Sequence, residues 1–524
     1  MTFVSFYFLA FLTGLGAVYY IVPASARWVV LLAGSLLFYL RAGLSFVPFM
    51  VSAALVTYAG ARIISGIHEK AAERLKTASS REEKKSVKAG EKRSAKRVMW
   101  ITILIVLAVL FYTKFAEKAA ALLQGGAASG SPALYVIVPL GISYYTFSTV
   151  GYVLDVYWKR YPAEKNFFRY LLYVCYFPHI LQGPIARYDR LGVQFREPHY
   201  FDYRNVCFGA QLMLWGFFKK LVIADRFAPF VTTVIGDWKN ASGSVLFFTM
   251  VLYAIQLYTD FSGCVDMARG MSQIFGIEIE KNFAQPYFAT SVDDFWRRWH
   301  ITLGAWFRDY LYMPVSISGF VKKLSRSARK KFGPAAGQNV TTICALIVVW
   351  LATGLWHGTG WNYIIWGMWQ GGIIMLSFLL RQFYPKALKV LHFDPDSPEF
   401  HVFRIIRTFL LTGIIPRIIT RAPGLRAAWG IMKRMIRIPG LSTFRESIIN
   451  YGMTDTEFRI GLFSVLLLLL TSVMKEKGCS IREHLAERNI LFRWAVYLFI
   501  LFCVVLFGKY GPGYNAASFI YMKF

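Results

Sequence analysis

Charged residues are what this sequence has least of. Only 17% of its 524 residues are charged, whereas 56% are hydrophobic, and the mean hydropathy is +0.43. A soluble chain of this length carries about a quarter charged residues, so the composition argues against a water-soluble protein. Cysteine is also scarce: six are present, and none forms a Cys-x-x-Cys pair. We therefore predict neither a disulfide framework nor a cysteine metal site.

The motifs of several enzyme classes are missing as well. Glu69 follows His68, but no second histidine completes the His-Glu-x-x-His motif of metalloproteases. There is no Gly-x-Ser-x-Gly elbow, no Gly-x-Gly-x-x-Gly loop and no phosphate-binding P-loop. The histidines are too dispersed to argue for zinc from sequence alone. No metal site and no bound cofactor are predicted.

Long apolar runs are what the sequence does have, and several reach the roughly 20 residues that cross a bilayer as a helix. They are residues 3–22, 28–40, 44–59, 99–113, 134–157, 207–224, 245–259, 340–356, 361–380, 460–474 and 490–508. We predict an all-α polytopic membrane protein with about eleven spans, give or take two. The first run lacks the basic flank of a signal peptide, so it is expected to be a span or a membrane-embedded helix.

The net charge of +30 is concentrated between the apolar runs. Residues 62–97 hold twelve Lys and Arg against five Glu, and 319–338 are basic again. By the positive-inside rule these segments are cytoplasmic, the first as a loop or a solvated helix. Because this explains the charge, no nucleic-acid partner is predicted, although anionic lipid or a phosphorylated donor could meet some of it. Residues 381–445 mix short apolar pieces with Arg and Pro, which indicates interfacial or re-entrant helices.

Two breaks in the apolar pattern carry further expectations. Residues 125–132 are rich in Gly and Ser and predict a flexible turn. In 171–187, Pro178 and Pro184 bracket His179 within a run too short to span, which predicts a re-entrant element. We favour a structural role for this histidine over a catalytic one.

Four charged residues lie within or beside apolar runs. Lys219 and Lys220 follow two phenylalanines, and we expect them to snorkel to an interface. Asp260 and Asp266 are expensive at membrane depth and should face a bundle interior. Pairing with Lys or Arg is the favoured role for these carboxylates, with chemistry as the alternative.

The stretch that organises the chain runs from Ser291 to Tyr363, and it begins with a charged, aromatic helix at 291–300. Ser291 is a candidate N-cap, and Asp293 and Asp294 fall in the positive first turn of the helix it starts. These two carboxylates can pair at i+4 with Arg297 and Arg298.

The same helix is expected to continue to Pro314. Trp296, His300, Leu303 and Phe307 then fall on one face at spacings of 4, 3 and 4. The pattern places His300 on the apolar, inward side.

His357 lies in a different setting, at the end of an apolar span. Gly354, Gly358 and Gly360 surround it and allow a helix end and the close approach of a substrate. Asn362 is expected to cap the next span. Each histidine alone could be a hydrogen-bonded structural residue, but two in such settings favour general-base catalysis on an acyl group.

Several motifs in order resemble one family. Phe295-Trp-Arg-Arg-Trp-His-Ile-Thr-Leu303 and Gly354-Leu-Trp-His-Gly358 resemble the membrane-bound O-acyltransferase (MBOAT) family, and in particular its alginate O-acetylation subgroup. The supporting stretches are residues 177–184, 216–225, 258–263, 282–287 and 306–312. The resemblance is strong over 135–380 and departs at Met313–Phe320, where the acetylation proteins have a glycine-rich loop.

The resemblance implies one membrane-embedded domain over 1–524, with re-entrant and interfacial helices around a transmembrane tunnel and a core at 135–380 that holds both histidines. It implies that His357 is the main catalytic residue and His300 its companion. An acetyl group from cytoplasmic acetyl-CoA would cross a bacterial plasma membrane. An SGNH-hydrolase-like acetyltransferase outside would then modify an exopolysaccharide or cell-wall polymer.

The remaining candidates have two interpretations each. The aromatic side chains shape the tunnel or only pack, and the arginines meet donor phosphates or pair with Asp293, Asp294 and Asp309. The candidate substrate-binding residues are Trp296, Arg297, Arg298, Trp299, Arg308, Trp356 and Asn362. The alternatives to acetylation are D-alanyl transfer from an acyl-carrier protein to teichoic acid, a polymer transporter without enzymatic activity, and an inactive assembly scaffold.

Overall fold

The chain folds almost entirely into helices. A computed structural model describes residues 2–123, 138–437, 442–511 and 514. Over these residues there is no β-strand, and one isolated bridge joins Phe283 and Trp299. The all-α prediction is therefore confirmed. The contacts divide the chain into two compact units: unit 1 is Met1–Ala210 with Ala268–Glu280, and unit 2 is Gln211–Met267 with Lys281–Phe524.

Nine helical segments in the described parts of the chain are long and apolar enough to cross a membrane. They are Ala24–Ala42, Leu44–Thr77, Arg81–Ala116, Tyr203–Gly236, Gly243–Ile274, Pro334–His357, Trp361–Leu380, Asp455–Glu476 and Ile490–Phe507. The other two apolar runs form shorter helices of 16 residues each, α1 (Phe6–Ile21) and α5 (Ile142–Tyr157). The count thus lies at the lower end of the predicted range, and the chain is a multi-pass membrane protein.

Unit 1 is built from the N-terminal helices and from parts of two later ones. Besides α1 and α5 it contains α2 (Arg27–Ala42), α3 (Val47–Thr77), α4 (Arg81–Leu123), α6 (Phe167–Cys175), α7 (Phe177–Ile180), the start of α8 (Tyr203–Phe217) and the end of α10 (Gly243–Ile274). Short 3-10 turns precede α2 and α3, and a π-helical turn spans Tyr188–Gly192.

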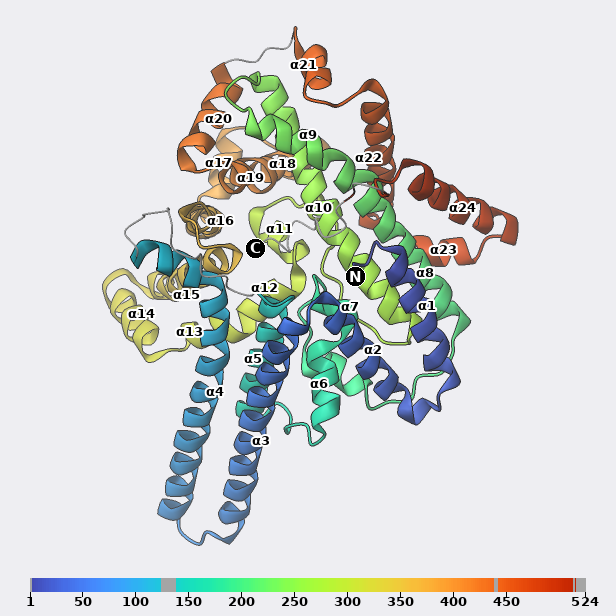
Figure 1. Ribbon diagram of the computed structural model, residues 1–524. Coiled ribbons are helices and arrows are strands. Elements are labelled where there is room, and N and C mark those ends of the chain that lie inside the picture. Colours follow the sequence, from blue (N-terminus) through green and yellow to red (C-terminus); the bar gives the residue numbers. More distant parts are fainter. Residues whose placement is uncertain (1, 124–137, 438–441, 512–513, 515–524) are drawn as a thin grey trace. The chain divides into compact units, whose positions relative to one another are not determined.

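The basic segment 62–97 is helical. It comprises the second half of α3 and the first half of α4, which lie side by side (Figure 1) and are joined by only three residues. The helical alternative of the sequence prediction is thus the one that applies. Lys84, Lys88, Lys92 and Lys96 follow one another at four-residue spacing along α4, and all four are exposed. Such a row cannot enter hydrocarbon.

The proline-broken segment forms two short helices, and its re-entrant position stays a prediction. Helix α6 ends at Cys175, and α7 is a single turn that holds His179 fully buried. The imidazole Nε2 lies 3.1 Å from the carbonyl oxygen of Tyr173, and Nδ1 is buried without a hydrogen-bond partner in the described structure. The structural role favoured for this histidine stays a prediction. A Cβ at Gly183 would come within 2.3 Å of the Cα of His179, so only glycine fits there. The predicted turn at 125–132 lies outside the described residues.

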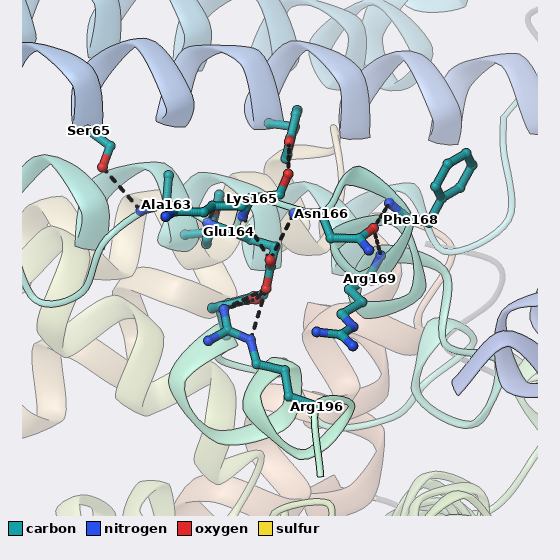
Figure 2. A network of polar contacts seen from close by, with 11 residues as sticks. Ser65, Ala163, Glu164, Lys165, Asn166, Phe168, Arg169 and Arg196 are labelled. Atoms are coloured by element: carbon teal, nitrogen blue, oxygen red, sulfur yellow. Dashed lines mark hydrogen bonds and ion pairs between the residues drawn. The ribbon is translucent and has the colours of Figure 1, made fainter. Parts of the chain in front are cut away.

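A buried carboxylate holds the connection between α5 and α6 (Figure 2). Glu164 accepts hydrogen bonds from the backbone N–H of Lys165 (2.7 Å) and of Asn166 (2.9 Å). The Tyr188 hydroxyl and the Arg196 guanidinium donate to the same carboxylate, the latter with Nε at 3.0 Å. Burial alone would raise the pKa of Glu164, but these donors outweigh it and lower the pKa below its ordinary value. The carboxylate is therefore charged and fully hydrogen-bonded.

Unit 2 contains the remaining helices. They are the end of α8, α9 (Asp225–Gly236), most of α10, α11 (Val292–Arg298), α12 (Ile301–Phe307), α13 (Met313–Ser316), α14 (Gly319–Phe332), α15 (Pro334–His357), α16 (Trp361–Leu380), α17 (Tyr384–Val390), α18 (Pro398–Phe409), α19 (Ile415–Arg421), α20 (Leu425–Arg437), α21 (Phe444–Asn450), α22 (Asp455–Glu476), α23 (Ile481–Ala486) and α24 (Ile490–Phe507). The described residues of segment 381–445 form only short helices and none of the nine candidate spans. That these helices are interfacial or re-entrant stays a prediction.

The two adjacent lysines do not snorkel, and that prediction is wrong. Lys219 and Lys220 lie in a π-helical turn (Phe218–Ala224) and are buried. Lys219 Nζ lies 2.7 Å from Asp266, and Lys220 Nζ lies 2.8 Å from Asp225 and 2.6 Å from Asp260. The predicted pairing of the carboxylates is confirmed. The lysines turn inward because these buried acids need cationic partners.

Candidate active site

The helix at 291–300 begins as predicted. Ser291 caps α11, because its hydroxyl accepts the backbone N–H of Asp294 at 3.1 Å. Arg297 pairs with Asp293, and Arg298 Nε lies 3.0 Å from Asp294, both at i+4. These charged pairs lie on the outer face of a short helix whose other face packs into unit 2.

The helix does not continue through His300 to Pro314, so that prediction is wrong. Helix α11 ends at Arg298, and His300 has a left-handed backbone conformation with φ 48° and ψ 52°. Helix α12 begins at Ile301, a π-helical turn spans Arg308–Tyr312, and Pro314 lies in the first turn of α13 rather than at a helix end. A left-handed histidine is uncommon and persists only where its surroundings impose it.

Asn282 imposes this bend. Its backbone carbonyl accepts the N–H of Ile301, and its side-chain Oδ1 accepts both the N–H and the hydroxyl of Thr302, each of the three at 3.0 Å. The asparagine thus supplies the cap that α12 lacks from its own N-cap residue. The chain leaves α11, turns at His300 and starts again as α12.

The same asparagine selects the tautomer of His300. The imidazole Nδ1 lies 3.3 Å from Asn282 Oδ1, an oxygen already identified as an acceptor by the N–H of Thr302. Nδ1 must therefore carry the proton, which leaves the lone pair on Nε2. Nε2 is buried and has no hydrogen-bond partner among the described residues. Burial also lowers the pKa of His300 to about 3, so the ring is neutral at physiological pH.

His357 ends α15, where glycines bring two helices into contact. A Cβ at Gly354 would lie 2.8 Å from the carbonyl oxygen of Tyr363, and one at Gly367 would lie 2.5 Å from that of Trp350. Neither position has room for a side chain, so α15 and α16 pack backbone against backbone. His357 is buried at the end of this tight hairpin.

A tryptophan lies between the two histidines. The ring centroid of Trp356 is 5.9 Å from that of His300 and 4.6 Å from that of His357. On its other side His357 is 4.7 Å from Trp366, and Trp366 is 5.9 Å from Trp296. The structure thus joins both predicted histidines through one continuous aromatic row within unit 2.

The predicted aromatic candidates divide into two groups. Trp356 and Trp296 belong to the row, and Trp296 Nε1 donates to Gln370 Oε1 at 3.2 Å. Trp299 is buried in an apolar cluster with Phe261 and Phe295, and Trp296 of the row packs against that cluster.

The polar candidates engage in local contacts. Arg308 Nε lies 2.8 Å from Asp309, and Arg298 also reaches Glu476 at 2.8 Å. The ion pairs expected of the arginines are therefore present. Asn362 does not cap α16, because the N-cap is Gly360 and no side-chain cap bond forms there; the capping prediction is wrong.

Three residues of this arrangement were absent from the sequence-based candidates: Asn282, Trp366 and Gln370. Asn282 stands within one of the quoted motifs, and that position is the signal that could have identified it. The other two lie on one face of α16 at i, i+4 spacing, a pattern that apolar packing produces equally well.

Chemically, the arrangement provides a neutral base in dry surroundings. An imidazole with a bare, buried Nε2 can take the proton of a hydroxyl nucleophile. The surrounding aromatic rings exclude water, which would otherwise hydrolyse an activated acyl group. No three His, Cys, Asp or Glu side chains cluster in the parts of the chain that are described.

Comparison with known proteins agrees with this chemistry. The model of the MBOAT, membrane-bound O-acyltransferase family matches residues 161–391. A probable alginate O-acetylase of Azotobacter vinelandii is 31% identical over 439 residues, which cover 82% of this chain and 76% of the relative. A peptidoglycan O-acetyltransferase of Helicobacter pylori is 31% identical over 59% of each chain. A teichoic acid D-alanyltransferase of Bacillus subtilis is 28% identical over 52% of this chain and 65% of its own.

The family match contains every residue of the aromatic row and both histidines. The Azotobacter relative extends the similarity over most of the chain. The chain therefore belongs to the membrane-bound O-acyltransferase family, and its enzymatic class is that of an O-acyltransferase.

Proposed function

We propose that this protein moves an acetyl group from acetyl-CoA, a cytoplasmic thioester donor, across the membrane for O-acetylation of an extracellular or cell-wall polysaccharide. The observation that carries the proposal is the bare Nε2 of His300 in the aromatic row that leads to His357. The names of the alginate and peptidoglycan relatives favour acetyl as the group and a carbohydrate polymer as its destination.

In the proposed reaction His357 is the general base or acyl relay, and His300 is the second catalytic group. The acceptor hydroxyl attacks the thioester carbonyl while an imidazole takes the hydroxyl proton. The C–O bond forms, the C–S bond breaks, and the proton passes to the departing thiolate. In that step one imidazole accepts the proton at a ring nitrogen and releases it to the thiolate.

The proposed setting is the bacterial plasma membrane, with an SGNH-hydrolase-like acetyltransferase or other polysaccharide machinery as the partner outside the cytoplasm. Arg298 and Arg308 form ion pairs that do not use all of their N–H groups. We propose that the remaining N–H groups bind a phosphate of the acyl donor. Trp296, Trp356 and Trp366 would line the acyl path.

The test is thioester turnover with labelled acetyl-CoA by the purified protein in detergent. Wild type should release free CoA and transfer label, whereas His357→Ala should be slower by about 10²- to 10⁴-fold, the range of general acid–base contributions. His401→Ala is the matched control, because His401 is exposed in the same unit. Equal turnover by His357→Ala and the control would reject the catalytic assignment.

A second candidate is D-alanyl transfer from a carrier protein to teichoic acid. The similarity to the Bacillus subtilis D-alanyltransferase favours it. If acetyl-CoA gives no turnover with wild type, the same assay with a D-alanyl-loaded carrier protein decides between the donors. Turnover that again depends on His357 would then assign the carrier as the donor.

A further inference from the structure

Unit 1 contains a pocket that the acyl-transfer proposal does not use. Its volume is about 190 Å³, and it lies where the chain enters α2, beside the start of α6 and the segment before α8. Three arginines line it, Arg27, Arg169 and Arg196, against one carboxylate, Glu197. The arginines come from segments far apart in sequence, so the fold brings their charges together.

Arg27 is held rigidly without a carboxylate partner. Its Nε donates to the carbonyl of Val22 at 3.1 Å, one Nη donates to that of Tyr20 at 3.2 Å, and the other donates to that of His199. Within the described residues it forms no ion pair, so its charge is not neutralised. A cation at the N-terminal end of α2 also opposes the helix dipole, so helix stability does not explain it.

Arg169 has unused hydrogen-bonding capacity. Its guanidinium lies 5.3 Å from the ring centroid of Trp28, and its Nε is buried with no hydrogen-bond partner in the described structure. Figure 2 shows the guanidinium standing apart from the dashed contacts that tie Arg196 to Glu164. A buried donor without an acceptor is costly, and a ligand oxygen would remove that cost.

Arg196 contributes the third guanidinium group, and only part of it is hydrogen-bonded within the protein. Glu164 engages its Nε and Nη2, which leaves the other terminal nitrogen for a ligand. The imidazole of His199 contacts the carbonyl oxygen of Gln194 at 2.8 Å, so it is already fixed by the protein. The polar wall of the pocket therefore offers mainly guanidinium donors.

We propose that this pocket binds a phosphate group, and that the phosphate belongs to an anionic phospholipid. Guanidinium forks match phosphate geometry and bind it with paired hydrogen bonds. Tyr19, Trp28, Leu31, Phe195 and Ile277 also line the pocket and offer apolar surface to the rest of such a ligand. The site is independent of the histidines and of the reaction proposed for them.

The lipid source is favoured over a soluble one by the position of the pocket. Ala24, Ser25, Arg27 and Trp28 are among the first residues of the candidate span Ala24–Ala42. These lining residues thus place the pocket at one end of a candidate membrane helix, and the ends of membrane helices are where phospholipid headgroups lie.

Native mass spectrometry of the full protein in detergent tests this directly. Phosphatidylglycerol and diacylglycerol with the same chains are titrated in parallel, so that only the phosphate-bearing headgroup differs. Phosphatidylglycerol should bind wild type and bind Arg169→Gln about tenfold more weakly, since a charge-assisted hydrogen bond is lost. Arg169→Lys should recover part of the affinity.

Arg190→Gln is the matched control, because Arg190 is exposed in unit 1, pairs with Glu280 and does not line the pocket. Its phosphatidylglycerol affinity should equal that of wild type. Glycerol 3-phosphate and inorganic phosphate are the soluble arms: if they bind as tightly as the lipid, the phosphate site stands and its source is a soluble ligand. Equal lipid binding by Arg169→Gln and Arg190→Gln, or equal binding of diacylglycerol by wild type, would overturn the proposal.

Discussion

Glu164 in unit 1 and His300 in unit 2 are both buried polar side chains in a connection between helices. Glu164 in unit 1 is 5% exposed, and His300 in unit 2 is 2% exposed. The carboxylate has every acceptor position served by a neighbour, whereas the imidazole keeps a bare nitrogen in a left-handed backbone. The comparison teaches that buried polarity has two uses: complete hydrogen bonding fixes a fold, and a strained residue with an unused basic atom is available for chemistry.

The largest effect should come from removing that basic atom. His300→Asn keeps a residue type that tolerates the left-handed conformation but has no imidazole. We expect the rate of acyl transfer to fall by about 10²- to 10⁴-fold, with little change in the thermal unfolding midpoint. Turnover of labelled thioester and a melting curve of the same preparation measure the two quantities. His401→Asn serves as the exposed control. If His300→Asn lowered the unfolding midpoint but not the rate, His300 would have a structural role like that of Glu164.

Neutralising the carboxylate of unit 1 should have the opposite signature. Glu164→Gln keeps the shape but removes the charge that two backbone N–H groups, Tyr188 and Arg196 share. We expect the free energy of unfolding to fall by about 2 kcal/mol, the scale of a hydrogen bond to a charged group. Denaturant titration measures it, with the exposed Glu278→Gln as control. If the remaining folded protein also lost its turnover rate, the assignment of a purely structural role would fail.

A substitution at Asn282 tests whether the orientation of His300, and not only its presence, matters for the rate. Asn282→Ala removes the acceptor that orients Nδ1 of His300 and selects its tautomer. We expect kcat to fall about tenfold while KM stays unchanged, because outer partners that orient a catalytic imidazole contribute on that scale. Steady-state kinetics against acetyl-CoA separate the two constants. A change confined to KM would place the asparagine in substrate binding instead.

The smallest effect concerns pH. Burial keeps the pKa of His300 near 3, so the wild-type rate should not fall through this group between pH 8 and pH 5. Asn282→Asp would place a negative charge beside Nδ1, raise the pKa of His300 and add an acid limb to the pH–rate profile. An unchanged profile in Asn282→Asp would contradict this account.

The titration of Glu164 should change the stability of the protein rather than its rate. Its pKa is lowered below 4.5, so its stabilising effect is complete above pH 4.5 and is lost as the pH falls further. Unfolding midpoints measured from pH 7 to pH 3 should show that loss in wild type and not in Glu164→Gln.

The sequence was sufficient for whatever depends on local pattern. Apolar length predicted the spans, and the cap at Ser291 with its two i+4 ion pairs followed from spacing alone. It was not sufficient for the break at His300, because the spacing of Trp296, His300 and Leu303 fits an unbroken helix equally well. The bend depends on Asn282, a partner 18 residues away that no local period reveals.

The buried lysines show the same limit from the other direction. A lysine beside an apolar run has a flexible stem that can reach an interface, and local sequence favours that outcome. Whether Lys220 turns inward depends on Asp260, 40 residues away. Long-range partners of this kind decide the direction of a charged side chain, and a single sequence does not pair them.

The contact between Gly354 and Gly367 shows which further residues the Trp-His motif needs in order to hold its histidine in place. Both positions are filled by backbone from the opposite helix, and no methyl group fits at either. A related chain that keeps the tryptophan and histidine but carries a larger residue at one of these glycines would have to separate the two helices. Its histidine would then be displaced from Trp366. Such chains can be recognised as degenerate copies from their sequences, before any activity is measured.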